Sequence, residues 1–251
     1  MGLFNRTASR MSGSTTLLLS ADPGNSLLDA ARLYDPDVRS WHGRLVFHNG
    51  VLLFGPVTVT PKSEQQAGLP AGAAVAWYTR VAMQTRRDER PAEAKLADGD
   101  RLVRGLALRL GGTTRPESLQ PQLQLMASVY SEQGLEPDQV VSVLRPFGGD
   151  LRIEDQEKDT YNVSGKEIYF FTAYWSPQRF LAMFEPAALG KLRSRRPHHW
   201  DLVTGVKASQ AASELCLCVG EAALALASRV DGIVTDVLGF RVTKPGDMLL
   251  R

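Results

Sequence analysis

The stretch from Ala211 to Val230, AASELCLCVGEAALALASRV, decides the fold. Small or apolar side chains occupy almost every face of a helix drawn through it, which is typical of a buried helix. The charged residues within it are Glu214, Glu221 and Arg229. The pair Asp231-Gly232 then supplies a residue able to adopt positive φ where a helix must stop, and residues 233–242 predict a strand. We therefore expect a buried helix that packs across a sheet.

A shorter version of this arrangement lies at residues 102–114, where LVRGLALRL runs into two glycines and two threonines. In both halves of the chain the predicted order approximates strand, helix, two or more strands, helix, strand. This is the order of the ferredoxin-like, split βαβ unit. We predict an α+β fold of two tandem ferredoxin-like units with antiparallel sheets backed by helices. One larger mixed domain is the alternative.

The predicted organisation has three parts: a flexible N-terminal tail over residues 1–14, a first α+β unit over 15–118 and a second over 119–251. In the first unit we expect a helix capped by Asn25 or Ser26 and a hairpin whose turn contains Asn49-Gly50. The highly charged run 85–100, TRRDERPAEAKLADGD, predicts a solvated loop because charges of both signs are mixed in it.

In the second unit, the run Pro146-Phe147-Gly148-Gly149 is expected to stop a helix over 138–144. The most aromatic run, IYFFTAYW at 168–175, predicts a central strand covered on both faces. A further strand is expected over 202–206, which leaves the residues just before it in a surface loop.

Composition limits the classes of function. The 251 residues are 43% hydrophobic and 22% charged, as in soluble globular proteins, and the formal net charge is only +2. This charge balance argues against a nucleic-acid partner. The first residues contain no apolar core of signal-peptide length, and no stretch is long enough to span a bilayer, so we expect a cytoplasmic protein without membrane contact.

The two cysteines, Cys216 and Cys218, lie two positions apart inside the apolar helix. Helical geometry turns such positions roughly 200° from each other, so they cannot form a disulfide. We expect both to pack as small apolar side chains in a reducing compartment.

The most suggestive chemistry lies in HHWD, residues 198–201, where two imidazoles and a carboxylate follow a short basic cluster. Adjacent histidines on a strand point to opposite faces, so they cannot hold one metal ion together. A catalytic role would also require a nucleophile or a third ligand nearby. We therefore assign no catalytic residue, metal or cofactor. The candidate binding residues, which offer aromatic walls and positive charge, are Trp175, Arg179, Arg195, Arg196, His198, His199 and Trp200.

Two functions from different classes fit these observations. The first is a non-catalytic binding protein of the regulatory or immunity type, which acts through a protein–protein surface. The second is an enzyme or binding protein that acts on a small molecule at the candidate residues, because cationic and aromatic groups suit an anionic or aromatic ligand. The sequence contains none of the common hydrolase, NTPase or dehydrogenase motifs, which argues against those three classes. Their absence does not decide whether the protein is an enzyme. Open sheet edges would also allow a homodimer.

Overall fold

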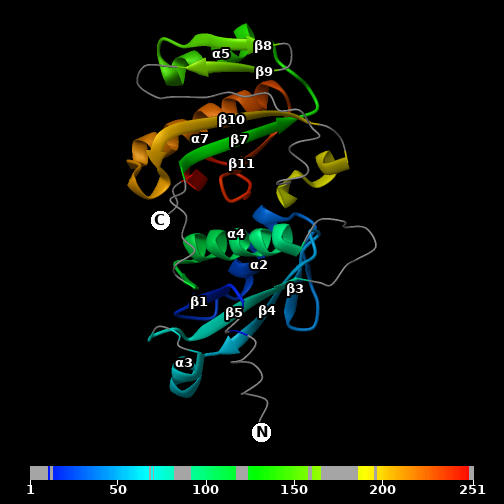
Figure 1. Cartoon of the computed structure of the whole chain (residues 1–251), viewed down its shortest axis with the longest axis vertical. Helices are drawn as coiled ribbons and strands as arrows, with labels where there is room; N and C mark the ends of the chain where they lie inside the picture. Colours follow the sequence, from blue (N-terminus) through cyan, green and yellow to red (C-terminus); the bar gives the residue numbers. More distant parts are fainter. Residues whose placement is uncertain are drawn as a thin grey trace. The chain divides into compact units, whose positions relative to one another are not determined.

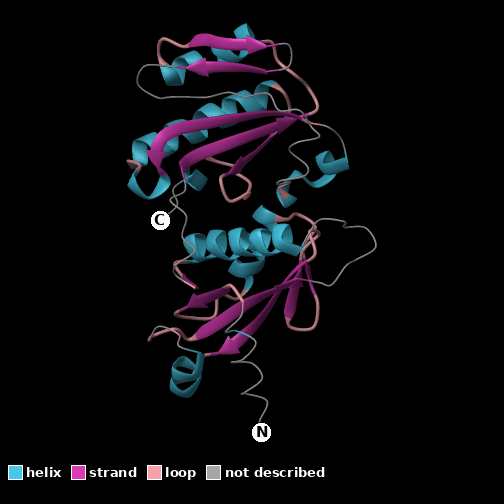
Figure 2. Cartoon of the chain, viewed as in Figure 1, coloured by secondary structure: helices cyan, strands magenta, loops and turns pink. Residues whose placement is uncertain are grey.

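The computed structural model describes residues 11, 14–67, 69, 71–81, 92–116, 124–157, 160–164, 186–194 and 197–248. The chain divides into two compact units, Met1–Gln120 with Arg251 and Pro121–Leu250. Helices and antiparallel strands are mixed in each unit (Figure 2), so the predicted α+β class is confirmed. Within the described residues, no helix is both long and apolar enough to cross a membrane.

The first unit contains one six-stranded antiparallel sheet in the order β2-β3-β4-β5-β1-β6. Its elements are β1 (Thr16–Leu19), α2 (Asn25–Tyr34), β2 (Arg39–Ser40), β3 (Arg44–Val46), β4 (Val51–Thr58), α3 (Pro61–Ala67), β5 (Val75–Val81), α4 (Ala92–Leu110) and β6 (Thr113–Arg115). The hairpin β3–β4 forms around Asn49-Gly50 as predicted, with Gly50 at φ 79°. The cap of α2 was predicted wrongly, because Gly24 precedes the helix and no side chain caps it.

Helix α4 lies across one face of this sheet, and α2 packs beside it (Figure 1). The prediction of a solvated loop over 85–100 is wrong from Ala92 onward, because α4 begins there. Two charged side chains of the first turns point inward instead of into water, with Lys95 4% exposed and Asp98 2% exposed. The remainder of the predicted loop lies outside the described residues.

Asp98 belongs to a buried polar network that ties α4 to the hairpin. The side-chain amide of Asn49 donates to Asp98 Oδ2 at 3.3 Å and to the hydroxyl of Tyr34 at 3.2 Å. Arg101 pairs with the other carboxylate oxygen, Oδ1, at 3.3 Å. Because buried polar groups cost free energy unless they are hydrogen-bonded, this network specifies how the hairpin meets the helices.

The second unit contains a three-stranded antiparallel sheet in the order β10-β7-β11 and a separate two-stranded sheet of β8 and β9. Its elements are β7 (Gln124–Ser131), α5 (Pro137–Gly148), β8 (Arg152–Glu157), β9 (Thr160–Ser164), the 3-10 segment Ala187–Ser194, β10 (His198–Lys207), α7 (Ser213–Arg229), β11 (Ile233–Asp236) and the 3-10 turn Pro245–Met248. The predicted strand 168–175 lies outside the described residues.

Helix α7 is the buried helix expected from the sequence. It packs against β7, β11, α5 and the turn Pro245–Met248. Gly220 allows that turn to approach, since a Cβ placed there would lie 2.9 Å from both Cα and O of Pro245. Glycine therefore serves close packing at this position. The fully buried residues of α7 include Val219, Ala222, Ala223 and Leu226, all 0% exposed.

The end of α7 differs from the prediction in detail. Asp231 itself adopts positive φ, at 48°, and Gly232 is needed because a Cβ there would lie 2.9 Å from the carbonyl oxygen of Tyr130. The following strand ends at Asp236, whereas we predicted a strand as far as residue 242. One oxygen of the Asp236 carboxylate accepts the backbone N–H groups of Leu238 and Phe240, both at 2.9 Å, and so closes a turn.

Two further boundaries were also predicted wrongly. Helix α5 continues to Gly148 past Pro146, which is tolerated because only one turn follows and a single backbone hydrogen bond is lost. Strand β10 begins at His198, four residues before the predicted start at Leu202. The HHWD motif is therefore part of a sheet, which fixes the direction of each of its side chains.

Candidate functional site

Three of the predicted binding residues, His198, His199 and Trp200, lie in the described part of the chain, at the start of β10. The other four, which are Trp175, Arg179, Arg195 and Arg196, lie outside the described residues. Along β10 the side chains alternate between the two faces of the sheet. His198 and Trp200 share one face, where their rings stack with centroids 6.0 Å apart, and His199 points to the other.

His199 belongs to a buried polar cluster with residues of β7. Its ring stacks on Tyr130, with centroids 4.6 Å apart and planes 4° from parallel. Its Nε2 lies 2.7 Å from Oδ1 of Asp201, and the same oxygen accepts a hydrogen bond of 2.5 Å from the hydroxyl of Ser128. Burial and the nearby Asp201 carboxylate raise the pKa of Tyr130 above its ordinary value, so this phenol stays protonated.

This cluster contains serine, histidine and aspartate, but their order does not suit nucleophilic catalysis. In a catalytic triad the serine donates to the imidazole, which removes its proton, and the carboxylate orients the imidazole from the far side. Here Ser128 donates to Asp201. Ser128 and His199 are also each only 3% exposed. The arrangement suits a structural polar contact between β7 and β10.

Trp200 lies in the hydrophobic core on the opposite face and is 1% exposed. Its indole Nε1 donates a hydrogen bond of 2.8 Å to the hydroxyl of Tyr161 on β9. This bond links the two sheets of the unit. Burial raises the pKa of Tyr161 from 10.0 to about 12, although the hydrogen bond from Trp200 acts in the opposite direction.

The raised pKa of Tyr161 predicts a loss of stability in alkali. The unfolded chain ionises this phenol near pH 10.0 whereas the folded chain holds its proton to about pH 12. The contribution to stability is therefore complete below pH 10.0 and is lost as the pH rises to about 12. We expect urea unfolding to show a free energy of unfolding that falls across this pH window. The free energy of unfolding of the Tyr161→Phe variant should fall less steeply with pH. Equal slopes would contradict the assignment.

The cysteines have the environment expected from the sequence. Cys216 is 4% exposed in the core of the second unit, and the thiol of Cys218 donates to the carbonyl oxygen of Phe147 at 3.7 Å. Burial raises the pKa of both thiols, so neither is a ready nucleophile. Among the described residues, no three His, Cys, Asp or Glu side chains are placed to hold a metal ion.

A second candidate lies in the first unit, at the turn that joins β2 to β3. Trp41 and Arg44 flank this turn and exchange both backbone hydrogen bonds, at 2.9 and 3.2 Å. The two residues between them have positive φ, His42 at 47° and Gly43 at 70°, as in the type I′ turns that join twisted strands. The Trp41 side chain is 55% exposed.

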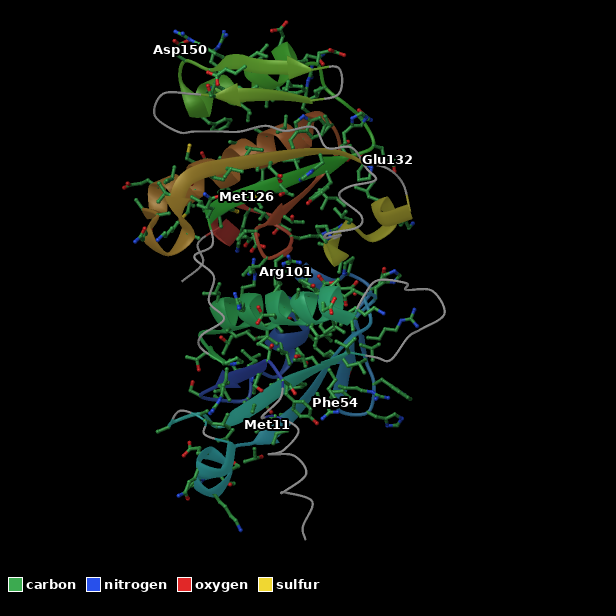
Figure 3. All side chains as sticks on the ribbon, viewed as in Figure 1. Met11, Phe54, Arg101, Met126, Glu132 and Asp150 are labelled. Carbon is green, nitrogen blue, oxygen red and sulfur yellow. The ribbon has the colours of Figure 1, made fainter. Side chains whose placement is uncertain are left out.

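Arg44 is placed between two aromatic rings. The central carbon of its guanidinium lies 4.0 Å from the ring centroid of Trp41 and 5.6 Å from that of Phe54. Phe54, labelled in Figure 3, stacks in turn on Tyr78 at 5.5 Å. No described residue accepts a hydrogen bond from the Arg44 side chain, and its Nε is buried without a partner. A guanidinium held in this way retains its donors for a ligand.

The strand register extends this surface across four strands. Arg39 pairs with Val46, Val46 with Leu52, and Leu52 with Arg80, and alternation places all four on the same face as Arg44. Thr79, the neighbour of Arg80 on β5, faces α4, because a Cβ on Gly99 would lie 3.6 Å from it. The face that carries the arginines is therefore the one opposite α4. We call it the arginine face, which comprises Arg39, Trp41, Arg44, Val46, Leu52, Phe54 and Arg80.

Comparison with known proteins does not assign the chain to a family, since no family model, curated protein or solved structure matches it. The sequence analysis did not find the arginine face. Its one local signal is Trp-His-Gly-Arg at 41–44, in which glycine holds the second central position of a two-residue hairpin turn.

Proposed function

We propose that the chain is a non-catalytic binding protein that acts through a protein–protein surface, and that this surface includes the arginine face. The observation that carries the proposal is Trp41, a large aromatic side chain that is 55% exposed and packs against the guanidinium of Arg44. Tryptophan and arginine are the residues most enriched where protein interfaces gain their binding energy. Tryptophan has only two χ angles, so it also loses little conformational entropy on binding.

The unit architecture that we propose is the tandem ferredoxin-like one. Support comes from the order β6-β1-β5-β4 with α2 and α4 in the first unit, to which β3 and β2 add an extension. In the second unit the order β11-β7-β10 with α5 and α7 supports it. Boundaries at 15–118 and 119–251, and a cytoplasmic protein without cofactor, stay predictions.

The test of this function is to capture the partner protein from the native host. The captured partner must be present in a stoichiometric amount relative to the chain. We expect Trp41→Ala to reduce capture at least about tenfold, because it removes the central aromatic contact. The matched control is Leu96→Ala, since Leu96 is exposed to a similar extent, 59%, but lies on α4. A partner that both variants capture as well as the wild type would contradict the proposal.

The small-molecule alternative keeps the site around Trp175, Arg179, His198, His199 and Trp200. Within its described part, His198 and His199 point to opposite faces and Trp200 is a core residue. No contact among these residues favours a ligand over packing, so the protein-binding proposal stands first.

A further inference from the structure

The charge of the arginine face indicates what kind of partner it fits. Its described strands place three arginines on one surface, Arg39, Arg44 and Arg80, with the apolar side chains of Val46 and Leu52 between them. The strands β2, β3, β4 and β5 themselves contain no Asp or Glu, and Glu64 between β4 and β5 belongs to α3. This surface is therefore positive although the whole chain is nearly neutral, and its charges are not paired within these strands.

Arg44 is the best-prepared group on the face. Its guanidinium lies over the Trp41 ring, 4.0 Å from the ring centroid, and a guanidinium carries parallel N–H groups at its edges. Two parallel N–H donors match the two oxygens of a carboxylate, which is the strong bidentate arrangement of arginine. Because the rings exclude water from the faces of the guanidinium, a carboxylate bound at its edge would form a partly desolvated pair.

We propose that the arginine face binds an acidic segment of the partner protein, with a Glu or Asp carboxylate held by Arg44 and apolar side chains of the segment against Trp41, Val46 and Leu52. This inference rests on the proposed protein-binding function. An extended segment can place both kinds of residue on this face when acidic and apolar side chains lie two positions apart, because residues i and i+2 share a face. Arg39 and Arg80, both exposed, provide further positive charge on either side of Val46 and Leu52.

Single-stranded nucleic acid is less well suited to the same surface. Its binding requires free aromatic faces on which bases can stack. On the arginine face Phe54 stacks on Tyr78 and Arg44 lies over Phe54 and over one side of Trp41, so of these three rings only Trp41 keeps a large exposed area for a base. Tyr78 is also only 5% exposed. The apolar positions Val46 and Leu52 are aliphatic and offer a base no ring.

The probe that tests this inference is a short fluorescent peptide of Glu-Ser-Leu-Ser repeats, in which glutamate and leucine share one face of an extended strand, titrated with the full chain at low ionic strength. We expect Arg44→Ala to weaken binding at least about tenfold, because a desolvated charge pair is lost. Arg44→Lys should weaken it by a factor of about three to ten, since lysine keeps the charge but loses the planar bidentate contact. Thermal unfolding of each variant shows whether it is folded.

The controls separate the possible causes. Arg32→Ala removes one positive charge from α2, away from the sheet, where Arg32 pairs with Asp29, and should bind as the wild type does. The same peptide with glutamine in place of glutamate should not bind. Binding that Arg44→Ala and Arg32→Ala weaken equally would overturn the inference. Tighter, Arg44-dependent binding of oligothymidine would also overturn it in favour of nucleic acid.

The two proposals fail in different ways. If capture of the native partner depends on Trp41 but the acidic peptide does not bind, the protein-binding function stands and the acidic partner is wrong. If the peptide binds through Arg44 while native capture does not depend on Trp41, the carboxylate site stands and the proposed function is wrong.

Discussion

Leu226→Asp is expected to unfold at least the second unit. Leu226 is 0% exposed and lies among the core residues that α7 buries against β7 and α5. An aspartate there must either bury an unpaired charge or be protonated, and we expect a loss of more than about 4 kcal/mol of the free energy of unfolding. Single domains have about 5 to 15 kcal/mol in total, so the loss approaches the whole stability of the unit. Circular dichroism melting measures it.

The control is Ser228→Asp, two residues further along the same helix. Ser228 is exposed, so the same carboxylate remains in water there and the cost should stay within about 0.5 kcal/mol. The loss of free energy of unfolding caused by Leu224→Asp should lie between those of the other two variants, because Leu224 is only partly buried against the same core. A Leu226→Asp protein that melts like the Ser228→Asp protein would show that α7 does not organise the second unit.

Trp200→Ala is expected to be the second most damaging change, with a loss of about 3 to 5 kcal/mol. The substitution leaves a large cavity in the core and also removes the hydrogen bond to Tyr161 that links the two sheets. Urea unfolding measures the loss. Tyr161→Phe keeps the ring but removes this hydrogen bond and the one that Tyr161 donates to the carbonyl oxygen of Leu135 at 3.4 Å, and it should cost about 1 to 2 kcal/mol.

Trp41→Ala is the matched control for Trp200→Ala, because it removes the same side chain from an exposed position. It should leave the urea midpoint almost unchanged while it weakens partner capture. Trp200 was a candidate binding residue on the sequence evidence, and this pair of variants separates binding from packing. A Trp200→Ala protein that is as stable as the wild type and has lost only ligand binding would favour the small-molecule alternative.

The elements that could be predicted from the sequence are those marked by a local signal. The run of small and apolar residues before Asp231 identified the buried helix, and Asn49-Gly50 identified the hairpin β3–β4. These signals act within a few residues, so no tertiary information was required.

The errors arose where tertiary contacts decide the structure. The charges of Lys95 and Asp98 resemble those of a solvated loop, but α4 turns both inward, and Asp98 meets Asn49, distant in the sequence. In the sequence, His199 and Asp201 resemble an exposed reactive pair. In the structure, Tyr130 and Ser128 of β7 pack against them. Neither partner can be found without the strand register.

The arginine face was missed for the same reason. Its residues come from four strands, and only the pairing of those strands places Arg39, Arg44 and Arg80 on one surface. The net charge of the chain does not reveal such a surface, because acidic residues elsewhere in the sequence offset the charges of its arginines. A net charge of +2 therefore could not reveal a small positive surface.

The close packing of the turn Pro245–Met248 on Gly220 has a consequence for folding during synthesis. Met248 is 1% exposed in the core of the second unit, and β11 closes one side of its sheet, so this core is complete only after residue 248 has been made. The sheet of the first unit already has its edge strand β6 once Arg115 has been made. During synthesis the first unit can therefore complete its sheet early, whereas β7, α5, β8 and β9 of the second unit wait for α7, β11 and the closing turn, which are made last.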